Sequence, residues 1–329
     1  MLKKLSALPI DTFLLAMAAT VAIAALFPAR GAFADFMSVA AKVVIALLFW
    51  LYGARLSPQQ AWQGVKRWQL HLLVLATTFV IFPLLGLACR GLVPWLLNTD
   101  LYNGLLFLCL VPSTVQSSIA FTSIARGNVS AALVSASLSN IVGIALTPLL
   151  VVLLMNTKGG AQMDASAVRD VVVQLLLPFV AGQLMRPWIA DWVARHAVLT
   201  KLVDRGSILL VVYTAFSMGM VEHIWASVDP WQLAIVAVVA VVLLAVVLGF
   251  TGLLGRLTGL DRGDRIVLLF CGSKKSLASG LPMALVFFPA ATVGVIMLPL
   301  MIFHQIQLIV CSVIASRLSR GEEPAAVAA

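Results

Sequence analysis

Residues 267–282 read VLLFCGSKKSLASGLP, and residues 105–118 read LLFLCLVPSTVQSS. In both stretches an apolar run reaches a cysteine, Cys109 or Cys271, and then gives way to helix breakers and small polar side chains. A pair of interrupted hydrophobic segments at matching positions of two halves is typical of transporters with inverted repeats, where the breaks form a binding site at the middle of the bilayer. The alternative is that these Ser, Gly and Pro residues only let helices pack closely.

The composition places the chain in a membrane. Of its 329 residues, 62% are apolar and 11% are charged, whereas about 25% of the residues of a soluble domain are charged. At roughly 20 residues per spanning helix, this apolar content allows about ten spans and leaves no room for a separate soluble domain. Because the backbone must satisfy its own hydrogen bonds inside a bilayer, runs of this length are expected to be helices.

We therefore predict an all-α polytopic membrane protein with ten transmembrane helices. Hydrophobic runs and their charged, Gly or Pro boundaries give the expected spans as 10–28, 36–54, 69–90, 102–124, 129–155, 168–190, 203–222, 230–255, 264–288 and 291–316. We interpret residues 1–329 as one membrane transport domain made of two inverted five-helix repeats, about 10–155 and about 168–316. The fourth and ninth helices hold the interrupted stretches and are expected to cross at the midplane.

The 22 Lys and Arg residues predict the orientation. Fifteen lie on the side of the N-terminus, four lie on the opposite side, and three lie inside apolar runs. By the positive-inside rule, both termini are expected in the cytoplasm, with the protein in a bacterial inner membrane. Cations scattered in this way argue against a nucleic-acid partner, in spite of the net charge of +9. The four cysteines lie in apolar runs without CxxC spacing, which predicts neither a disulfide nor a metal site.

Two of the three cations inside apolar runs are adjacent, Lys274 and Lys275. Lys274 follows Arg265 by nine residues, so it is expected roughly 13 Å into a hydrocarbon core of about 30 Å. A cation at this depth costs about 2.5–3.5 kcal/mol and should face a cavity or a partner. Adjacent side chains diverge by about 100° on a helix, so we expect at most one lysine to face a solute. The other would contact helix ends, and the alternative is that the pair only ties carbonyl groups together.

Small polar residues accompany the lysines on the predicted broken helices and their neighbours. The candidate site residues are Ser113, Thr114, Gln116, Ser117, Ser118, Ser135, Ser139, Asn140, Ser273, Lys274, Lys275, Ser276, Ser279, His304 and Gln305. Ser135 and Ser139 share a helix face because they are four residues apart. No Asp or Glu lies in the middle of a predicted span. The sequence therefore gives no support for a sodium or proton site built on a buried carboxylate.

Several of these motifs resemble the bile acid:sodium symporter superfamily, in its divergent SBF-like branch. Residues 112–118, the motif IARGNV at 124–129, the Ser-rich helix and the Leu-Thr-Pro stop at 146–148 resemble the fourth and fifth helices of that superfamily. Residues 271–284 resemble its ninth helix. The resemblance implies a core of helices three to five and eight to ten and a panel of helices one, two, six and seven. It also implies that solute and Na⁺ bind where the broken helices cross.

The resemblance carries the family's sodium ligands onto particular positions. Its Ser/Asn segment falls near Ser117 and Ser118, and its fifth-helix ligands fall among Ser135, Ser139 and Asn140. Its Glu-x-x-x-Gln motif falls near Ser273 and Leu277, where this chain has no acidic residue and has two lysines alongside. A lysine in place of a metal cation could hold the same carbonyl groups together. Whether Na⁺ binds, near Ser117, Ser118, Ser139 and Asn140, stays open.

We expect a secondary transporter that moves a small organic solute across the inner membrane by alternating access. A lysine at the midplane and the positive N-terminal ends of broken helices favour an anionic solute. No cofactor is expected, with Na⁺ as the open exception, and the lipid bilayer is the other partner. Two alternatives are a sodium-coupled symporter of organic anions and a sensor that kept the scaffold and lost transport. An enzyme is not expected, since no nucleophile elbow, HExxH motif or carboxylate pair occurs.

Overall fold

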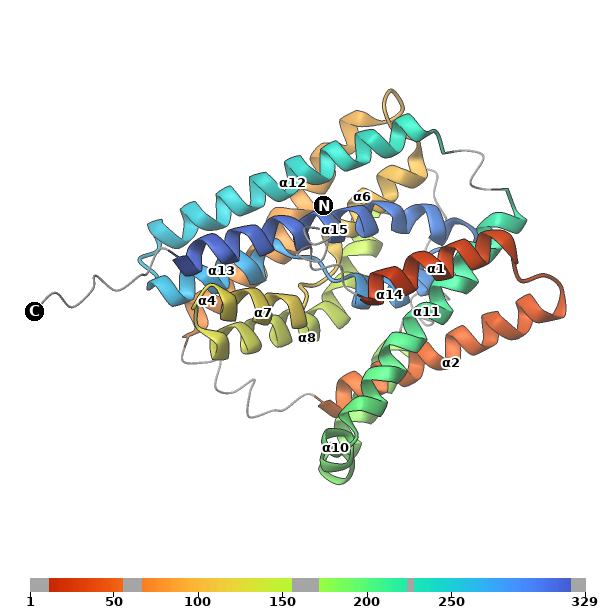
Figure 1. Cartoon of the computed structure of the whole chain (residues 1–329), viewed down its shortest axis with the longest axis horizontal. Helices are drawn as coiled ribbons and strands as arrows, with labels where there is room; N and C mark the ends of the chain where they lie inside the picture. The colour runs from red at the N-terminus through yellow and green to blue at the C-terminus, as the bar shows by residue number, and fades with distance from the viewer. Residues whose placement is uncertain (1–11, 56–66, 156–171, 224–227, 321–329) are drawn as a thin grey trace, which may run out of the picture. The chain divides into compact units, whose positions relative to one another are not determined.

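The computed structural model describes residues 12–55, 67–155, 172–223 and 228–320. Within these ranges the fold is helical and contains no β-strand (Figure 1). Six helical stretches of the described residues are long and apolar enough to cross a membrane, by length and composition: Ala32–Arg55, Trp68–Leu92, Val129–Met155, Ala197–Val221, Pro230–Leu257 and Ala290–Ser319. The all-α class predicted from the composition is therefore confirmed for the described residues, and these helices are consistent with a polytopic membrane protein.

The chain divides into two compact units. Unit 1 contains Met1–Leu56, Ala161–Asp229 and Leu281–Met297, and unit 2 contains Ser57–Gly160, Pro230–Gly280 and Leu298–Ala329. Each unit is therefore assembled from segments that are far apart in the sequence. Helices α14 (Leu277–Phe287) and α15 (Ala290–Arg320) each contribute residues to both units.

Unit 1 is built on two helix pairs. Besides Leu281–Met297 from α14 and α15, it contains α1 (Thr12–Leu26), α2 (Ala32–Arg55), the π-helical turn η5 (Val172–Leu176), α10 (Leu177–Arg195) and α11 (Ala197–Val221). Glycines allow α2 and α10 to touch backbone to backbone: a Cβ atom at Gly53 would lie 2.0 Å from the Phe179 carbonyl oxygen, and one at Gly182 would lie 2.0 Å from that of Trp50. Small residues at helix contacts are the usual device for close packing in a membrane.

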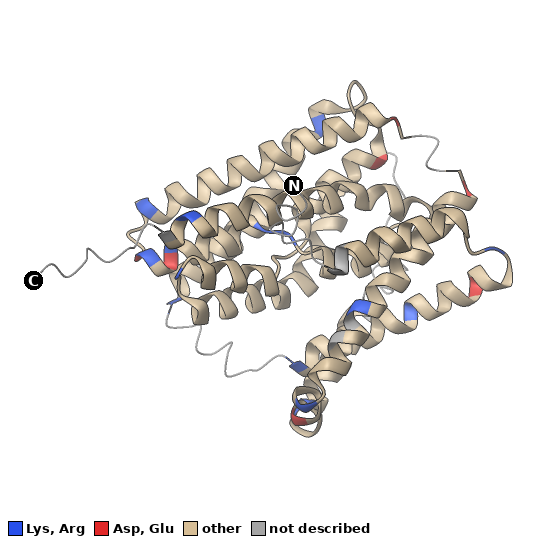
Figure 2. Cartoon of the chain, in the orientation of Figure 1, with Lys and Arg blue, Asp and Glu red and all other residues tan. Residues whose placement is uncertain are grey.

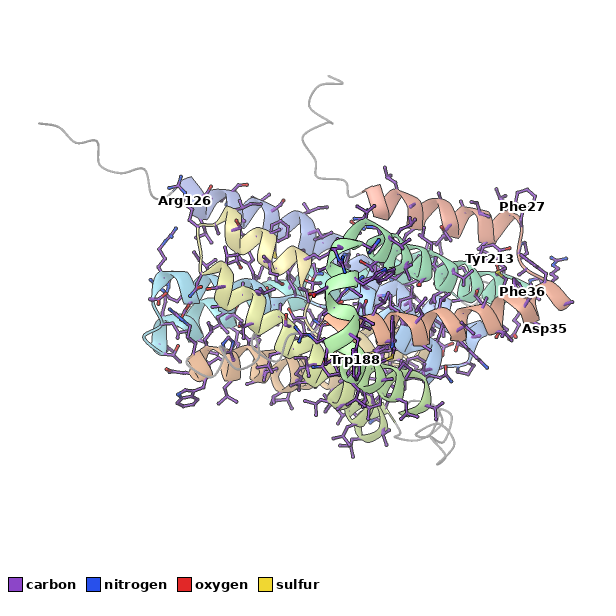
Figure 3. All side chains as sticks on the ribbon, turned by 90° about the horizontal axis from the view of Figure 1, so that it is seen from below. Phe27, Asp35, Phe36, Arg126, Trp188 and Tyr213 are labelled. Atoms are coloured by element: carbon purple, nitrogen blue, oxygen red, sulfur yellow. The ribbon has the colours of Figure 1, made fainter. Side chains whose placement is uncertain are left out.

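Helices α1 and α11 form the second pair of unit 1. The hydroxyl of Tyr213 on α11 donates a 2.9 Å hydrogen bond to the carbonyl oxygen of Phe27, which directly follows α1. Figure 3 labels both residues near one end of this helix pair. The bond satisfies one of the carbonyl groups that a helix C-terminus leaves free.

Unit 2 contains the two interrupted stretches. Its first helices are α4 (Trp68–Ala76), the π-helical turn η3 (Thr77–Ile81), α5 (Phe82–Ala88) and the 3-10 turn η4 (Cys89–Leu92). They are followed by α6 (Thr99–Leu110), α7 (Gln116–Ile124) and α8 (Val129–Met155), and later by α12 (Pro230–Leu257) and α13 (Arg262–Ser273). Most charged residues of this unit lie at helix ends, whereas one basic stretch lies in the connection between α13 and α14 (Figure 2).

The predicted spans locate the helices but differ in their ends. The expected span 203–222 starts later than α11, which begins at Ala197, and the span 168–190 ends before α10, which continues to Arg195. The expected span 69–90 is divided into α4, η3, α5 and η4. The expected spans 10–28 and 168–190 begin at residues that lie outside the described part of the chain, which starts at residue 12 and resumes at residue 172.

Candidate functional site

The first helix break lies between α6 and α7. Helix α6 starts where Asn98 caps it, because Asn98 Oδ1 accepts a 2.8 Å hydrogen bond from Leu101 N. It ends at Val111, whose backbone is extended, with φ −74° and ψ 155°. Pro112 follows, and proline disfavours a helical conformation in the residue before it. Residues 111–115 consequently form a non-helical link inside the span expected at 102–124.

The second break lies between α13 and α14, at residues 274–276. Lys274 ends α13 with an extended backbone, φ −100° and ψ 151°. The hydroxyl of Ser276 then accepts a 3.1 Å hydrogen bond from the backbone N–H of Ser279, in the first turn of α14. A serine that accepts a bond from an N–H three residues later is the usual start of a helix.

The two breaks contact each other directly. The backbone N–H of Ser276 donates to the carbonyl oxygen of Pro112 at 2.8 Å. The hydroxyl of Ser113 donates to the carbonyl oxygen of Cys271 at 2.6 Å, and Lys275 Nζ donates to that of Cys109 at 2.8 Å. Each of these two side chains lies four residues beyond the cysteine of its own stretch and binds the carbonyl group of the cysteine in the other. The contact is therefore reciprocal, with a serine on one side and a lysine on the other.

Lys275 binds three backbone carbonyl groups. In addition to Cys109, its ammonium donates to Val111 O at 2.8 Å and to Thr78 O at 2.9 Å, and the side chain is fully buried. Two of these acceptors belong to the C-terminal end of α6, which carries partial negative charge. The Phe82 ring lies 4.2 Å from Nζ. The ammonium thus has a hydrogen-bond acceptor for each of its three protons.

The π-helical turn η3 makes the third acceptor available. The N–H of Phe82 bonds the carbonyl oxygen of Thr77 rather than that of Thr78, which an α-helix would use. Pro83, the next residue, has no N–H to donate. Thr78 O is in this way released from the helix and is used by Lys275. Single π-helical turns inside α-helices are frequent at functional sites.

Gln307 on α15 fixes the backbone of Lys275. Its Oε1 accepts a 2.9 Å bond from Lys275 N, and its Nε2 donates a 2.9 Å bond to Lys275 O. The same Nε2 lies 2.8 Å from His304 Nδ1. Because one amide side chain holds both the N–H and the carbonyl group of Lys275, the position of this residue's backbone is closely defined.

Lys274 has very different surroundings. Its side chain is also fully buried, but within the described part of the chain its Nζ has no hydrogen-bond partner. Nζ lies 3.7 Å from the ring centre of Phe121 on α7 and 5.7 Å from that of Phe270 on α13. Phe270 belongs to an apolar cluster with Ala125, Ile266, Cys311 and Ala315. Lys275 therefore points to a carbonyl site, whereas Lys274 points to an apolar site.

Hydroxyl and amide groups connect α8 to both breaks. Ser139 Oγ accepts a 3.1 Å bond from Ser113 N, and Asn140 Nδ2 donates a 2.8 Å bond to Ser113 O. Asn140 Oδ1 accepts a 2.8 Å bond from Ser279 Oγ. Asn140 thus joins the first break to the first turn of α14. At the start of α7, Thr114 Oγ1 lies 2.7 Å from Ser117 Oγ and 3.1 Å from Ser118 Oγ.

A cluster of acidic and basic side chains stabilises the N-terminal end of α13. Asp261 caps this helix by accepting a 2.8 Å bond from the N–H of Asp264, and this bond, together with Arg67, lowers the pKa of Asp261. Arg67 also pairs with the Asp264 carboxylate, which accepts a 2.9 Å bond from Asn128 Nδ2. The start of α13 is thereby tied to α4 and to the turn between α7 and α8.

Comparisons with known proteins place the sequence in a family. The model of the SBF-like CPA transporter family covers residues 11–320. The chain belongs to this family. It is 50% identical to an uncharacterised protein of Pseudomonas aeruginosa, over 97% of this chain and 96% of that one. It is 48% identical to the Escherichia coli protein YfeH, whose name proposes a symporter, over 95% and 94% of the two chains.

More distant relatives belong to animals. Sodium/bile acid cotransporter 7 of Xenopus tropicalis is 26% identical over 83% of this chain and 80% of its own length. Membership of the SBF-like family and the apolar helices make the chain an integral membrane protein of the transporter class and not an enzyme. The resemblance that the sequence motifs indicated is confirmed.

The structure of this SBF-like protein brings most of the predicted site residues together. Those within the network of the two breaks are Ser113, Thr114, Ser117, Ser118, Ser139, Asn140, Lys275, Ser276 and Ser279. His304 reaches this network through Gln307. Lys274 lies at the break but points to the apolar cluster.

Four predicted residues have other surroundings. Ser135 lies 2.8 Å from His71 Nδ1, and Ser273 donates to Leu269 O of its own helix. Gln116 is exposed, and Gln305 is half-buried. Most of the predicted residues therefore belong to one network, and the others lie outside it.

Three residues around the lysines were not predicted from the sequence. Gln307 holds the Lys275 backbone, the carbonyl group of Thr78 accepts from Lys275, and the Phe121 ring lies beside Lys274. Gln307 belongs to a polar band with His304 and Gln305 that is visible in the sequence, but its partner is not. Pro83 indicates that an earlier carbonyl group lacks its helical partner. No sequence signal indicates that Lys275 uses such a group.

Proposed function

We propose that this protein is a secondary transporter in which Lys275 permanently occupies the place of a coupling sodium ion and which moves an organic anion by alternating access. The observation that carries the proposal is the binding of Lys275 Nζ to three backbone carbonyl oxygens at 2.8–2.9 Å. Carbonyl oxygens from interrupted helices are the groups that coordinate cations in such transporters. A tethered ammonium satisfies these groups without an ion from solution.

The reciprocal contact supports the inverted-repeat architecture. Ser113 and Lys275 occupy matching positions of the two stretches, and each binds the cysteine carbonyl group of the other stretch. Two antiparallel halves related by a two-fold axis would produce such a pair of contacts. We accordingly propose ten transmembrane helices in two repeats, with both termini in the cytoplasm of a bacterial cell.

The two compact units support a division of the protein into a panel and a core. The panel would be α1, α2, α10 and α11 of unit 1, and the core would include unit 2 with both lysines; Leu281–Met297, from the expected core helices, belongs to unit 1. Alternating access would then be a relative motion of the two units.

An anionic solute is favoured by the helix ends at the breaks. Both α7 and α14 begin there, and helix N-termini carry partial positive charge that attracts anions. Hydroxyl groups that could bind a solute surround these N-termini: Thr114, Ser117, Ser276 and Ser279. Lys275 would maintain the geometry of the site because its protons are already used by carbonyl groups.

A sodium-coupled symporter is the second candidate, and the name of the 26% identical relative favours it. One measurement distinguishes the two candidates, namely whether anion uptake requires Na⁺. Purified protein is screened by thermal shift against monocarboxylates, dicarboxylates and a sterol conjugate, in NaCl and in choline chloride, and each hit is tested for uptake into proteoliposomes. We expect a stabilising anion whose uptake is the same in both salts. Uptake that requires Na⁺ would establish the second candidate, and the absence of any hit or uptake would contradict transport.

The topology has its own test. Reporter fusions after Asn156 and after Ala329 should give opposite signals, with the C-terminal fusion reporting the cytoplasm. Equal signals from the two fusions would contradict the ten-helix arrangement.

A further inference from the structure

Within the part of the chain that the structure describes, Lys274 is a buried amine without a hydrogen-bond acceptor, one residue away from a lysine that has three. Its Nζ lies near two aromatic rings, over that of Phe121 on α7 at 3.7 Å and farther from that of Phe270 on α13 at 5.7 Å. The titratable groups that interact with it electrostatically are the thiols of Cys271, on the same helix, and Cys311, on α15. Within the described residues, neither α7, α13 nor α15 presents a carboxylate to it.

This environment suits a neutral amine better than an ammonium ion. A buried ammonium needs hydrogen bonds and an opposite charge to replace the water that it loses. Ring faces at 3.7 and 5.7 Å return only a fraction of that solvation. Buried thiols are weak acids and offer no fixed negative charge.

Three carbonyl groups near the C-terminal end of α13 already accept hydrogen bonds from hydroxyl groups. This end of the helix carries partial negative charge, which would attract an ammonium at Lys274. Leu269 O accepts from the Ser273 hydroxyl, Phe270 O from Ser118 and Cys271 O from Ser113. The Ser118 bond is long, at 3.3 Å. An ammonium at Lys274 would therefore compete with hydroxyl groups of the first break for the end of α13.

We propose that Lys274 binds and releases a proton during the transport cycle and couples solute movement to protons. The inference rests on the proposed transport function. The reaction is the addition of one proton from water to the Nζ lone pair and its later return to water, with no other bond made or broken. Neutral Lys274 lies beside two aromatic rings. Once protonated, it would compete for the carbonyl groups that accept hydrogen bonds from Ser113 and Ser118. The geometry of the two breaks thereby depends on protonation, whereas Lys275 keeps its charge.

The first test needs no solute. The melting temperature of the purified full-length protein is measured between about pH 6 and pH 9, a range in which an unfolded lysine remains charged. The unfolded state then binds more protons at Lys274 than the folded state, so the melting temperature of the wild type should rise with pH, by a few degrees. Lys274→Met should remove this rise. Lys274→Arg keeps a charge at every pH and should melt lower than the wild type throughout. Lys42→Met, at an exposed lysine of α2, is the control and should keep the wild-type slope.

Two outcomes would overturn the proposal. Equal pH slopes for the wild type and Lys274→Met would show that this amine does not change its charge. A loss of folding in Lys274→Met and in Lys274→Gln, with Lys274→Arg folded, would show that Lys274 is a permanently charged structural group.

The second test separates coupling from transport itself. Each anion that stabilises the wild type in the screen above is titrated at several pH values. Its affinity should change severalfold with pH in the wild type and stay constant in Lys274→Met. Anion uptake with no pH dependence would contradict proton coupling and leave the transport function intact. A wild type that takes up none of these anions would contradict transport, and the melting experiment would still decide whether Lys274 titrates.

Discussion

The two helix breaks are alike in sequence pattern and contact each other reciprocally, yet they are stabilised differently. At the first break, Ser113 contributes one hydroxyl bond to the carbonyl group of Cys271, and its own backbone is held by Ser139 and Asn140 on α8. At the second break, Lys275 contributes a full positive charge and three bonds. The comparison teaches that two stretches of similar sequence pattern can carry their charge on one side only, where Lys275 binds the end of α6.

The largest expected effect follows from removing the charge. Lys275→Met leaves three buried carbonyl groups without their donor, which should lower the free energy of unfolding by about 3–5 kcal/mol. Chemical or thermal denaturation of the purified protein measures the change. The same substitution at the exposed Lys42 is the control and should have little effect. If Lys275→Met is as stable as the wild type, the charge does not hold the breaks together.

Packing against the first break gives the next effect. A Cβ atom at Gly143 on α8 would lie 2.8 Å from Cβ of Pro112, a rigid ring that cannot rotate away. Gly143→Ala should therefore destabilise the protein by about 1–3 kcal/mol. Gly252→Ala on α12 is the matched control, since a Cβ there would have no neighbour within 4 Å. Equal melting temperatures for the two variants would show that the first break can shift freely.

The single hydroxyl of the first break should matter less. Ser113→Ala removes the bond to the carbonyl group of Cys271 and should cost about 1–2 kcal/mol. Ser273→Ala removes a bond within one helix and provides the comparison for a local effect. Denaturation curves of both variants beside that of Lys275→Met would rank the three side chains. A cost for Ser113→Ala equal to that for Lys275→Met would remove the asymmetry between the breaks.

The smallest expected effect concerns sodium. Because Lys275 already occupies the carbonyl groups, exchange of Na⁺ for choline at constant ionic strength should leave the melting temperature unchanged, and should change the affinity for any stabilising anion by less than about twofold. Thermal shift in the two salts measures both quantities. In Lys275→Met the site would be vacated, and a sodium-dependent rise of the melting temperature there would support the idea that the lysine replaces a cation. A saturable sodium effect in the wild type would contradict it.

Sequence reasoning identified the breaks because their signals are local. Pro112, with Val111 before it, ends α6, and Gly272, Ser273 and Ser276 border the gap after α13. It did not predict that the expected span 69–90 is interrupted by the π-helical turn η3. Pro83 removes one donor, but whether the helix forms a kink or a π-helical turn depends on which group donates to the freed carbonyl oxygen. That partner, Lys275, is 197 residues away from Thr78.

The sequence by itself determined the membrane-embedded helical class, the positions of the two breaks and the presence of two cations in an apolar run, because run length, proline and hydropathy act within a few residues. It also predicted that the adjacent lysines serve different neighbours, on the premise that both lie on a helix. The structure instead places them in the non-helical break, where Lys274 has an extended backbone. Only the tertiary structure decided that Lys275 binds the end of α6 while Lys274 faces Phe121, and that Ser135 pairs with His71. The reason is physical: hydrogen-bond partners and ring contacts in this core come from helices far apart in the chain, and their choice depends on how those helices pack.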